Sequence, residues 1–505
     1  DMHSVTVIKN GKTLCAADFG AYKREYWHVT YSLCKSITSL AIGMLIDDGA
    51  LKLEDRIADI FPTKASLMTA AFQKKLTVEN LLKMSSGVLF NEAGSVTETE
   101  WVRNFLESAA TFESGKGFSY NSMNTYMLSA VVQEKTGKPL KDFLEERLFK
   151  PLGITDVFWE SSPEGINKGG WGLYIKPEDV AKIGLLVMNG GEWNGKSLVS
   201  KGYIECATKK QNKAPEAYGG YDYGYQIWVR EEDAGFLFNG MFGQNLIGFK
   251  KSGIIVMSNA GNNEFFQVSG FFDTLHKYFG KDLEHESSDG GWYSRLRHLE
   301  RAQSQNDKKE ARQSVKLCRE LDKSGYTFNL SETAGLSTMP LILQMAQNNH
   351  TKGLSFVSFS LERGRFYIDA VESGEQKRFE VGFFKPAYTV VEYCGEKYMV
   401  GVTGRLCKNE DDVLVLKVRL SFVETANSRF IKFRFVSDDK IEAEFYEQPS
   451  EKYLSVALDC TVKEYKNIRF LDPVIAKLDS DFIEYKVQST FHPRLTAIKT
   501  QKSDK

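Results

Sequence analysis

Histidine is scarce in this chain, and its placement argues against one common type of catalytic site. The 505 residues include only seven histidines. Of these, only His3 and His28 precede the helix expected at residues 264–279, and neither lies in a triad-like context. The sequence therefore disfavours a serine–histidine–aspartate triad, and a nucleophilic serine would need another base.

Cysteine pairs are also lacking, because no two of the seven cysteines are spaced as C-x-x-C. The odd count and wide spacing argue against a disulfide framework and against a zinc site. Scattered thiols favour a reducing, cytoplasmic location. Residue 1 opens almost directly into a strand-like segment, so an exported form that has lost an upstream segment stays open. The cysteines are Cys15, Cys34, Cys206, Cys318, Cys394, Cys407 and Cys460.

Two further absences narrow the class of protein. The formal net charge is −1, so no basic field points to nucleic acid. No apolar run reaches the roughly 18 residues that a membrane-spanning helix needs. Apolar residues make up 42% and charged residues 26%, which is typical of a soluble globular protein. A chain of 505 residues is too long for one core, so two or three domains are expected.

Residues 1–283 mix strand and helix patterns. The pair Asn10-Gly11 predicts a hairpin. The segments "YGYQIWVR", "GFLFNGMFGQNLIGFKK" and "GIIVMSNAG" predict three consecutive strands. Strands at both ends with helices between them predict an α+β domain with one antiparallel sheet and a helical cluster. Helices are expected at residues 32–48, 77–84, 124–136, 140–149, 177–189 and 264–279.

The remainder of the chain changes character twice. Residues 284–325 are polar and charge-dense, which predicts a linker that contains a solvated helix. In residues 326–505, apolar and polar residues alternate with period 2 in several short runs, which predicts an all-β antiparallel barrel or sandwich. One run shows the alternation at Leu414, Leu416, Val418, Leu420 and Phe422.

The segment "YSLCKSITSLAIGMLIDDG", residues 31–49, places Ser32 and Lys35 at the start of a helical pattern. In one interpretation Ser32 caps the helix and Lys35 is a solvated side chain. In the other, Ser32 is a nucleophile whose proton passes to Lys35, which requires burial to lower the pKa of the lysine. The spacing alone is not specific, because Ser437 and Lys440 share it in what is expected to be a hairpin turn.

Two other clusters carry polar or glycine residues at element boundaries. In "GKGFSYNSMN", Tyr120 could shuttle a proton if a cation stabilised its phenolate. Asn121 or Ser122 could instead simply cap the helix that follows. In "FNGMFGQNLIGF", Gly240 and Gly243 interrupt a strand pattern, which indicates either close approach of a ligand or backbone, or a bulge.

Taken in order, these pieces resemble the serine β-lactamase and penicillin-binding protein superfamily, in its β-lactamase-related esterase, amidase and D-aminopeptidase branch. The resemblance covers residues 3 to about 280. It is carried by "YSLCKSITSLAIGMLIDDGALKLEDRIADIFP", "LTVENLLKMSSGV", "FSYNSMNTYMLSAVVQEKTGKPLKDFLEERLFKPLGITD" and "GGWGLYIKPEDVAKIGLLVMNGGEWNGKSLV". It implies an α/β/α sandwich of the β-lactamase/transpeptidase type. The C-terminal region resembles, more loosely, the lipocalin-like barrels appended to some relatives.

The resemblance also implies catalytic roles. Ser32 matches the acylated serine, Lys35 the motif lysine and Tyr120 the tyrosine of the Tyr-x-Asn motif. Whether lysine or tyrosine is the first base stays open. The oxyanion would be held by the backbone N–H groups of Ser32 and Met241. No metal or organic cofactor is required.

Substrate-binding positions follow from the same resemblance. Ser122 stands where the second motif usually has Asn, and Asn239-Gly240-Met241 matches the third motif. Phe238 stands where β-lactamases usually have Lys or His, so an aromatic wall and a preference for uncharged substrates are expected. Trp171, in "GGWG", is expected to line the site.

The function implied is a serine hydrolase that cleaves a small ester, amide or D-amino-acid peptide. The alternative is a penicillin-binding or β-lactamase-like protein that is acylated slowly and acts as a sensor or binding module. The expected partner is a small molecule or short peptide, not nucleic acid. The oligomeric state is not readable from the sequence.

Overall fold

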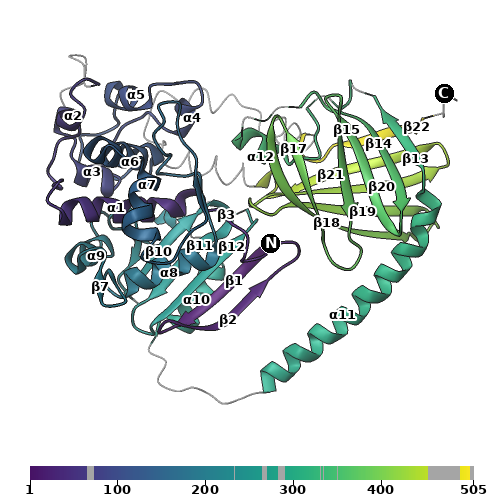
Figure 1. Ribbon diagram of the computed structural model, residues 1–505, viewed down its shortest axis with the longest axis horizontal. Coiled ribbons are helices and arrows are strands. Elements are labelled where there is room, and N and C mark those ends of the chain that lie inside the picture. The colour runs from purple at the N-terminus through teal and green to yellow at the C-terminus, as the bar shows by residue number, and fades with distance from the viewer. Residues whose placement is uncertain are drawn as a thin grey trace.

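The computed structural model describes residues 1–64, 73–232, 234–263, 270–281, 291–329, 331–333, 335–347, 349, 351–452 and 490–500. Figure 1 shows a body of helices and a sheet built from the first half of the chain, and a barrel built from the second half. Between them in sequence, the long helix α11 (Gly291–Leu317) runs along one side of the molecule to the barrel. This helix lies within the segment predicted to be a charged linker.

The first body is organised on a seven-stranded sheet with strand order β2-β1-β12-β11-β10-β9-β8, in which every pair is antiparallel. The predicted hairpin at Asn10-Gly11 is confirmed, because both residues have positive φ and join β1 to β2. The strands are β1 (Met2–Lys9), β2 (Lys12–Asp18), β8 (Asp222–Tyr223), β9 (Trp228–Arg230), β10 (Gly235–Gly240), β11 (Gln244–Phe249) and β12 (Ile254–Ala260).

One predicted strand is wrong. The segment 235–251 was expected to be a single strand, but it forms the antiparallel hairpin of β10 and β11. A 3₁₀ turn at Met241–Gly243 connects the two strands, with φ of 64° at Phe242 and 92° at Gly243. The glycines therefore mark the turn of a hairpin and not an interruption within one strand.

Helices and two small sheets complete the first body. The small sheets are β3-β5-β4, built from β3 (His28–Val29), β4 (Val157–Trp159) and β5 (Leu173–Ile175), and the pair β6 (Glu192–Trp193) and β7 (Lys196–Ser197). The helices are α1 (Cys34–Asp47), α2 (Ile57–Ile60), α3 (Val78–Leu82), α4 (Glu92–Ser95), α5 (Trp101–Glu107), α6 (Ser122–Thr136), α7 (Leu140–Leu144), α8 (Pro177–Met188), α9 (Lys201–Ala207) and α10 (Gly270–Phe279). The start of the helix expected at 264–279 lies outside the described residues.

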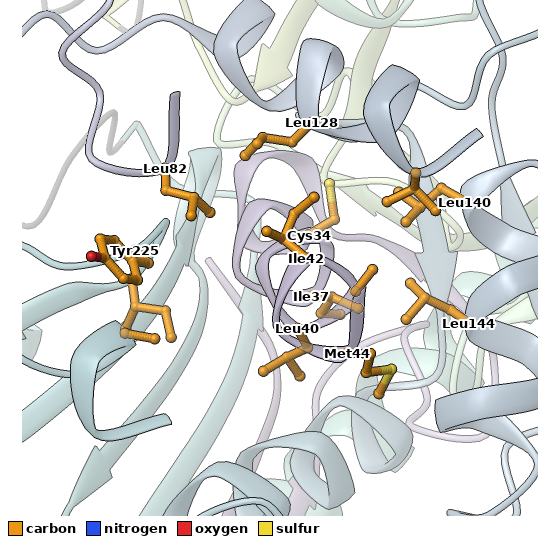
Figure 2. Close-up of a cluster of buried hydrophobic side chains, with 14 of the residues drawn as sticks. Cys34, Ile37, Leu40, Ile42, Met44, Leu82, Leu128, Leu140, Leu144 and Tyr225 are labelled. Atoms are coloured by element: carbon orange, nitrogen blue, oxygen red, sulfur yellow. The ribbon is translucent and has the colours of Figure 1, made fainter. Parts of the chain in front are cut away.

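Helix α1 is the centre of the larger core. Figure 2 shows its apolar side chains with Leu128 of α6 above them, Leu140 and Leu144 of α7 to the right, and Leu82 and Tyr225 to the left. Every residue from position 34 to 45 is buried. A helix enclosed in this way has little freedom to shift, so its first turn is a rigid mount for polar side chains.

The two faces of the large sheet pack against different helices. Phe236, Phe238, Leu246, Ile255 and Met257 belong to the core that contains α1 and α8. On the opposite face, Leu237, Ile247 and Val256 pack with Phe272 and Leu275 of α10. Alternation along each strand therefore produces three layers, helices over sheet over helix, as the predicted fold class requires.

The barrel has ten antiparallel strands in the order β16-β15-β14-β13-β22-β21-β20-β19-β18-β17. It is nearly closed, because β16 leads directly into β17 and Gly382 bridges to Thr403 on β18. The hairpin predicted at 437–440 is confirmed, since Ser437 pairs with Lys440. The strands are β13 (Ser324–Phe328), β14 (Leu354–Glu362), β15 (Arg365–Glu372), β16 (Glu375–Val381), β17 (Ala387–Tyr393), β18 (Glu396–Lys408), β19 (Leu414–Phe422), β20 (Ser428–Ser437), β21 (Lys440–Gln448) and β22 (Arg494–Lys499).

Candidate active site

Ser32 lies in a 3₁₀ turn, Tyr31–Leu33, that runs directly into α1. Leu33 is the N-cap of α1 and makes no side-chain cap hydrogen bond, so the capping interpretation of Ser32 is wrong. The Ser32 hydroxyl oxygen instead accepts a hydrogen bond from Lys35 Nζ at 2.8 Å. Tyr31, directly before Ser32, has a φ of 46°, a left-handed conformation that costs a non-glycine residue about 1–3 kcal/mol. Such strain often accompanies functional positions.

Lys35 is a buried cation whose two hydrogen-bond partners are neutral. Its side chain lies in the first turn of α1, and the residue is only 1% exposed. Besides Ser32, Lys35 Nζ donates to the carbonyl oxygen of Gly170 at 2.7 Å. Burial lowers the pKa of Lys35 to about 8, although the carboxylate of Glu92 opposes this shift. With a pKa of about 8, roughly a tenth of this lysine is uncharged at pH 7 and about half at pH 8.

Tyr120 completes the group of side chains around Ser32. Lys35 Nζ lies 5.1 Å from the centre of the Tyr120 ring, and that ring stacks on Trp228 with centroids 5.6 Å apart. Burial raises the pKa of Tyr120 above its usual value, and a hydrogen bond with Ser32 only partly offsets this shift. The phenol is therefore protonated at neutral pH and can donate a proton.

Asn121 and Ser122 behave largely as the capping interpretation of this loop predicted. The Asn121 side-chain oxygen accepts from Met123 N at 2.8 Å, and so Asn121 is the N-cap of α6. Ser122 is buried at the first position of the helix, and its backbone N–H donates to Glu92 Oε1 at 3.2 Å. These contacts fix the segment that carries Tyr120.

The hairpin turn between β10 and β11 lies against the segment that carries Ser32. A Cβ on Gly240 would lie 2.1 Å from the carbonyl oxygen of Thr30 and 3.2 Å from the N of Leu33. Only glycine allows this approach, so Gly240 marks close contact between two backbones, one of the two interpretations left open above. The ring of Phe242 also packs edge-on against Tyr31, with centroids 5.2 Å apart. Met241 is thereby held beside the nucleophile segment.

The structure corrects the expectation for Phe238. Its side chain is 0% exposed and belongs to the core beneath α1, so it presents no aromatic wall to a substrate. The physical reason is the alternation of β10, which turns Phe236 and Phe238 inward. Position 238 still lacks a cation. Arg230 binds Glu232, and Lys250 and Lys251 contact Thr208 and the Glu232 carbonyl oxygen.

Two other predicted substrate-binding residues have structural contacts. Asn239 is 7% exposed and donates from Nδ2 to Asn245 Oδ1 at 2.7 Å, across the hairpin. Trp171 is partly buried and stacks on Trp101, with ring centroids 5.9 Å apart. Their roles toward a substrate stay predictions.

Sequence reasoning missed two groups near Lys35. The first is the carbonyl of Gly170, whose backbone is so close to α6 that a Cβ would lie 2.7 Å from the Ser122 carbonyl oxygen. The glycine pair in "GGWG" could have indicated this approach. The second is Glu92, which bonds the Ser122 N–H and acts electrostatically on Lys35. No pattern in the sequence around Glu92 points to it.

Neither a metal site nor a membrane span is found in the parts of the chain that the structure describes. There, no three His, Cys, Asp or Glu side chains are grouped so that they could hold a metal ion. In the same parts, no helix combines the length and the apolar character that crossing a bilayer requires.

Comparison with known proteins places these motifs in a family context. A family model described as Beta-lactamase matches residues 3–275, more than half of the chain. The 6-aminohexanoate-dimer hydrolase of Paenarthrobacter ureafaciens is 24% identical over 268 residues, which are 48% of this chain and 67% of that protein. Esterase EstB of Burkholderia gladioli is 28% identical over 152 residues, 26% of this chain and 38% of the esterase. A solved penicillin-binding protein from Bacillus halodurans is 17% identical, covers 55% of this chain and 94% of its own, and has a TM-score of 0.44. The chain thus spans between about a third and two thirds of the length of these two curated relatives.

Proposed function

The chain belongs to the beta-lactamase family, and from this premise we propose that it is a serine hydrolase that cleaves a small ester, amide or D-amino-acid peptide through an acyl-enzyme on Ser32. The observation that carries the proposal is the contact of Ser32 Oγ with Lys35 Nζ at 2.8 Å, in a setting that lowers the pKa of the lysine to about 8. Strongly perturbed pKa values cluster at functional sites, and here the shift accompanies a direct contact with the candidate nucleophile.

Acylation begins when neutral Lys35 accepts the proton of the Ser32 hydroxyl as the oxygen attacks the substrate carbonyl carbon. Lys35 is favoured over Tyr120 as the first base because burial moves the two pKa values in opposite senses. Burial makes the lysine easier to deprotonate and the tyrosine harder to deprotonate. The Gly170 carbonyl keeps Lys35 Nζ oriented toward Ser32 in both protonation states.

Two backbone N–H groups, of Ser32 and Met241, are proposed to hold the oxyanion that forms. The approach of Gly240 to Thr30 brings the two donor segments together. Each such donor typically stabilises the transition state by about 3–4 kcal/mol.

Tyr120, protonated at neutral pH, then donates a proton to the leaving group and is reprotonated from Lys35. In the second half-reaction the same groups activate the water that releases the acyl group.

The absence of a cation at position 238 supports uncharged substrates. A substrate carboxylate beside the scissile bond would be partly desolvated, and an uncompensated buried charge is costly. We expect a short-chain nitrophenyl ester or a D-Ala nitroanilide to exceed a chromogenic cephalosporin in kcat/KM by about 10²-fold or more, which is roughly 2.7 kcal/mol. Faster turnover of the cephalosporin would contradict this assignment of substrate class.

The test of the function is fluorophosphonate labelling with mapping of the labelled residue, followed by turnover of the substrates named above. Ser32→Ala should abolish both labelling and turnover. Ser437→Ala is the matched control, because Ser437 has the same spacing to a lysine but lies in a hairpin turn. Labelling of Ser32→Ala would refute the assignment of the nucleophile. Labelling of Ser32 without turnover of any substrate in the panel would favour a slowly acylated sensor instead.

A further inference from the structure

The turn between β19 and β20, residues 423–427, is inserted between the barrel and the first body. We call it the docking turn. Four of its five residues are at most 2% exposed: Val423, Thr425, Ala426 and Asn427. A turn at the end of a hairpin is ordinarily exposed, so its burial against another domain marks a built interface. In Figure 1, β3 lies on the side of the first body that faces the barrel.

The first contact of the docking turn is with the strand that leads into the nucleophile. The carbonyl oxygen of Glu424 accepts a hydrogen bond from Val29 N at 2.9 Å, and the carboxylate of Glu424 accepts one from the indole of Trp27. Val29 precedes Ser32 by three residues. Thr30, between them, donates from its backbone N to the Leu173 carbonyl oxygen at 2.8 Å. The approach to Ser32 is therefore fixed by the barrel on one side and by β5 on the other.

The second contact of the barrel is with residues 261–263, which follow β12. A Cβ on Gly261 would lie 2.2 Å from the carbonyl oxygen of Ala426, so the backbone of the docking turn lies directly against this glycine. Asn263 forms two hydrogen bonds with Ser450, which follows β21. Asn263 Nδ2 donates to Ser450 Oγ at 3.0 Å, and Asn263 Oδ1 accepts from Ser450 N at 2.8 Å.

The segment 261–263 is in turn bonded to the hairpin turn beside the nucleophile. Asn262 N donates to the carbonyl oxygen of Phe242 at 3.1 Å. Phe242 directly follows Met241, whose N–H is one of the two donors proposed for the oxyanion. The barrel is therefore linked to both segments that carry the proposed donors, to one directly at Val29 and to the other through residues 261–263.

We propose that the barrel is a positioning element for the oxyanion hole, in which the docking turn and Ser450 hold the backbone N–H groups of Ser32 and Met241 at a fixed separation. The inference rests on the proposed function, because the oxyanion hole is part of that function. It assigns to the barrel a direct effect on the rate of the chemical step in the first body.

The physical reason is that the two donors belong to segments far apart in sequence. An oxyanion hole depends on donors that are already in place when charge develops, and a displacement of about 1 Å can cost up to about 10²-fold in rate. The two segments touch directly at Gly240 and through the rings of Tyr31 and Phe242. The docking turn and Ser450 hold the Ser32 segment and the Met241 segment at further points, and so limit rotation of one segment relative to the other.

The test uses the full chain with substitutions in the second contact. Asn263→Ala removes both hydrogen bonds to Ser450, Ser450→Ala removes one of them, and Gly261→Ala forces a methyl group against the docking turn. Tyr388→Phe is the control, because it removes another hydrogen bond between the two bodies, from Tyr388 Oη to the Ala21 carbonyl oxygen at 2.9 Å. For each variant we would measure kcat and KM for an ester, the same constants for its thionoester, and the melting temperature.

The oxygen-to-sulfur comparison separates positioning from a general loss of stability. The sulfur of a thiocarbonyl accepts hydrogen bonds from N–H groups poorly, so a thionoester gains little from the oxyanion hole. The kcat/KM of the ester divided by that of the thionoester therefore measures how much the oxyanion hole contributes. Asn263→Ala and Gly261→Ala should lower kcat for the ester by about tenfold or more, with KM changed less than twofold and a smaller ratio. Ser450→Ala should show the same change in smaller measure, and Tyr388→Phe should leave kcat, KM and the ratio unchanged.

Two outcomes would overturn the inference. One is an Asn263→Ala protein that is folded and has a kcat within twofold of the control. The other is a loss of kcat with no change in the oxygen-to-sulfur ratio, which would place the defect elsewhere. If Gly261→Ala does not fold, the two variants of the Asn263–Ser450 pair decide the matter. Failure of the proposed function itself would look different, because the unsubstituted protein would then not be labelled at Ser32, or would be labelled there without turnover.

Discussion

Two of the cationic side chains that the structure buries, Lys35 in the first body and Arg429 in the barrel, have opposite surroundings. Lys35, at the start of α1, is 1% exposed, and among the described residues its hydrogen-bond acceptors are the neutral oxygens of Ser32 and Gly170. Arg429, on β20 of the barrel, is 2% exposed and forms an ion pair with Glu447 at 2.9 Å. Arg429 also donates to the carbonyl oxygens of Ser337 and Met339.

The difference teaches how to distinguish a buried cation that supports structure from one that supports chemistry. The carboxylate of Glu447 also accepts hydrogen bonds from the backbone N–H groups of Leu341 and Ile342, at the start of α12 (Leu341–Ala346). A charge that is paired with a carboxylate stays charged and orders the end of the barrel. A buried lysine whose hydrogen-bond partners are neutral oxygens can become uncharged by losing its proton, and a general base needs this property.

The largest expected difference between the two buried cations is in catalysis, when Lys35 is replaced. Lys35→Met should lower kcat by about 10²- to 10⁴-fold, because the base is lost while a chain of similar length remains. Lys35→Arg should be as inactive, since a guanidinium keeps its proton at any working pH. The measurement is kcat for a neutral ester per folded molecule. Arg429→Met is the control and should change that kcat by no more than a few-fold; an active Lys35→Arg would place the base elsewhere.

The next effect is on stability and concerns the barrel. Arg429→Met leaves the carboxylate of Glu447 buried without its partner, and we expect a loss of about 3–5 kcal/mol in the free energy of unfolding. Replacing both partners, as Arg429→Met with Glu447→Leu, should recover much of that loss, because no uncompensated charge then remains. Denaturant unfolding of the three proteins gives the comparison. A single variant as stable as the parent would show that the pair does not order the barrel.

A smaller effect of opposite sign is expected for Lys35. Because its pKa is about 8 when folded and near 10.5 when unfolded, the folded state carries the full cost of the buried charge below pH 8. The cost falls between pH 8 and 10.5, where the unfolded state binds more protons, and is absent above that range. Lys35→Met should therefore raise the free energy of unfolding by about 1–3 kcal/mol at pH 7, with little gain at pH 10.5. A destabilised Lys35→Met at pH 7 would contradict this account.

Local patterns in the sequence were sufficient to predict the features that depend on neighbouring residues. The hairpins at Asn10-Gly11 and at 437–440, the helix after Ser32, and the alternating strands of the barrel all follow from short-range spacing. The spacing of Ser32 and Lys35 left two interpretations open, and the observed contact between the two side chains agrees with the one in which they interact. Their catalytic roles, and the domain boundaries at 283 and 325, stay predictions.

Features that depend on distant segments were not predictable in this way. The β10–β11 hairpin was missed because its turn, with Phe242 at a φ of 64°, has no standard turn residue before Gly243. The inward orientation of Phe238 was missed as well, because the sequence does not show which face of β10 packs against α1. The contact of the docking turn with Val29 joins residues almost 400 positions apart, and periodicity holds no information about it. All the family motifs lie in residues 3–280, so the sequence gives no sign of the contact between the docking turn and the segment that precedes Ser32.

The smallest effect expected concerns pH and tests the comparison without changing the fold. Only neutral Lys35 can accept the serine proton, so kcat/KM should rise about tenfold per pH unit up to about pH 8 and then level off. The buried histidines should not contribute to this limb, because burial lowers the pKa of His28 to about 4 and that of His3 well below its usual value. Arg429 cannot contribute either, since its charge is permanent. The measurement is kcat/KM for a neutral ester from pH 6 to pH 9.5, with Arg429→Met as the matched control that should keep the same limb. A flat profile, or a limb centred near the ordinary value for histidine, would show that Lys35 does not lose its proton in the free enzyme, and the distinction between the two buried cations would then rest on structure alone.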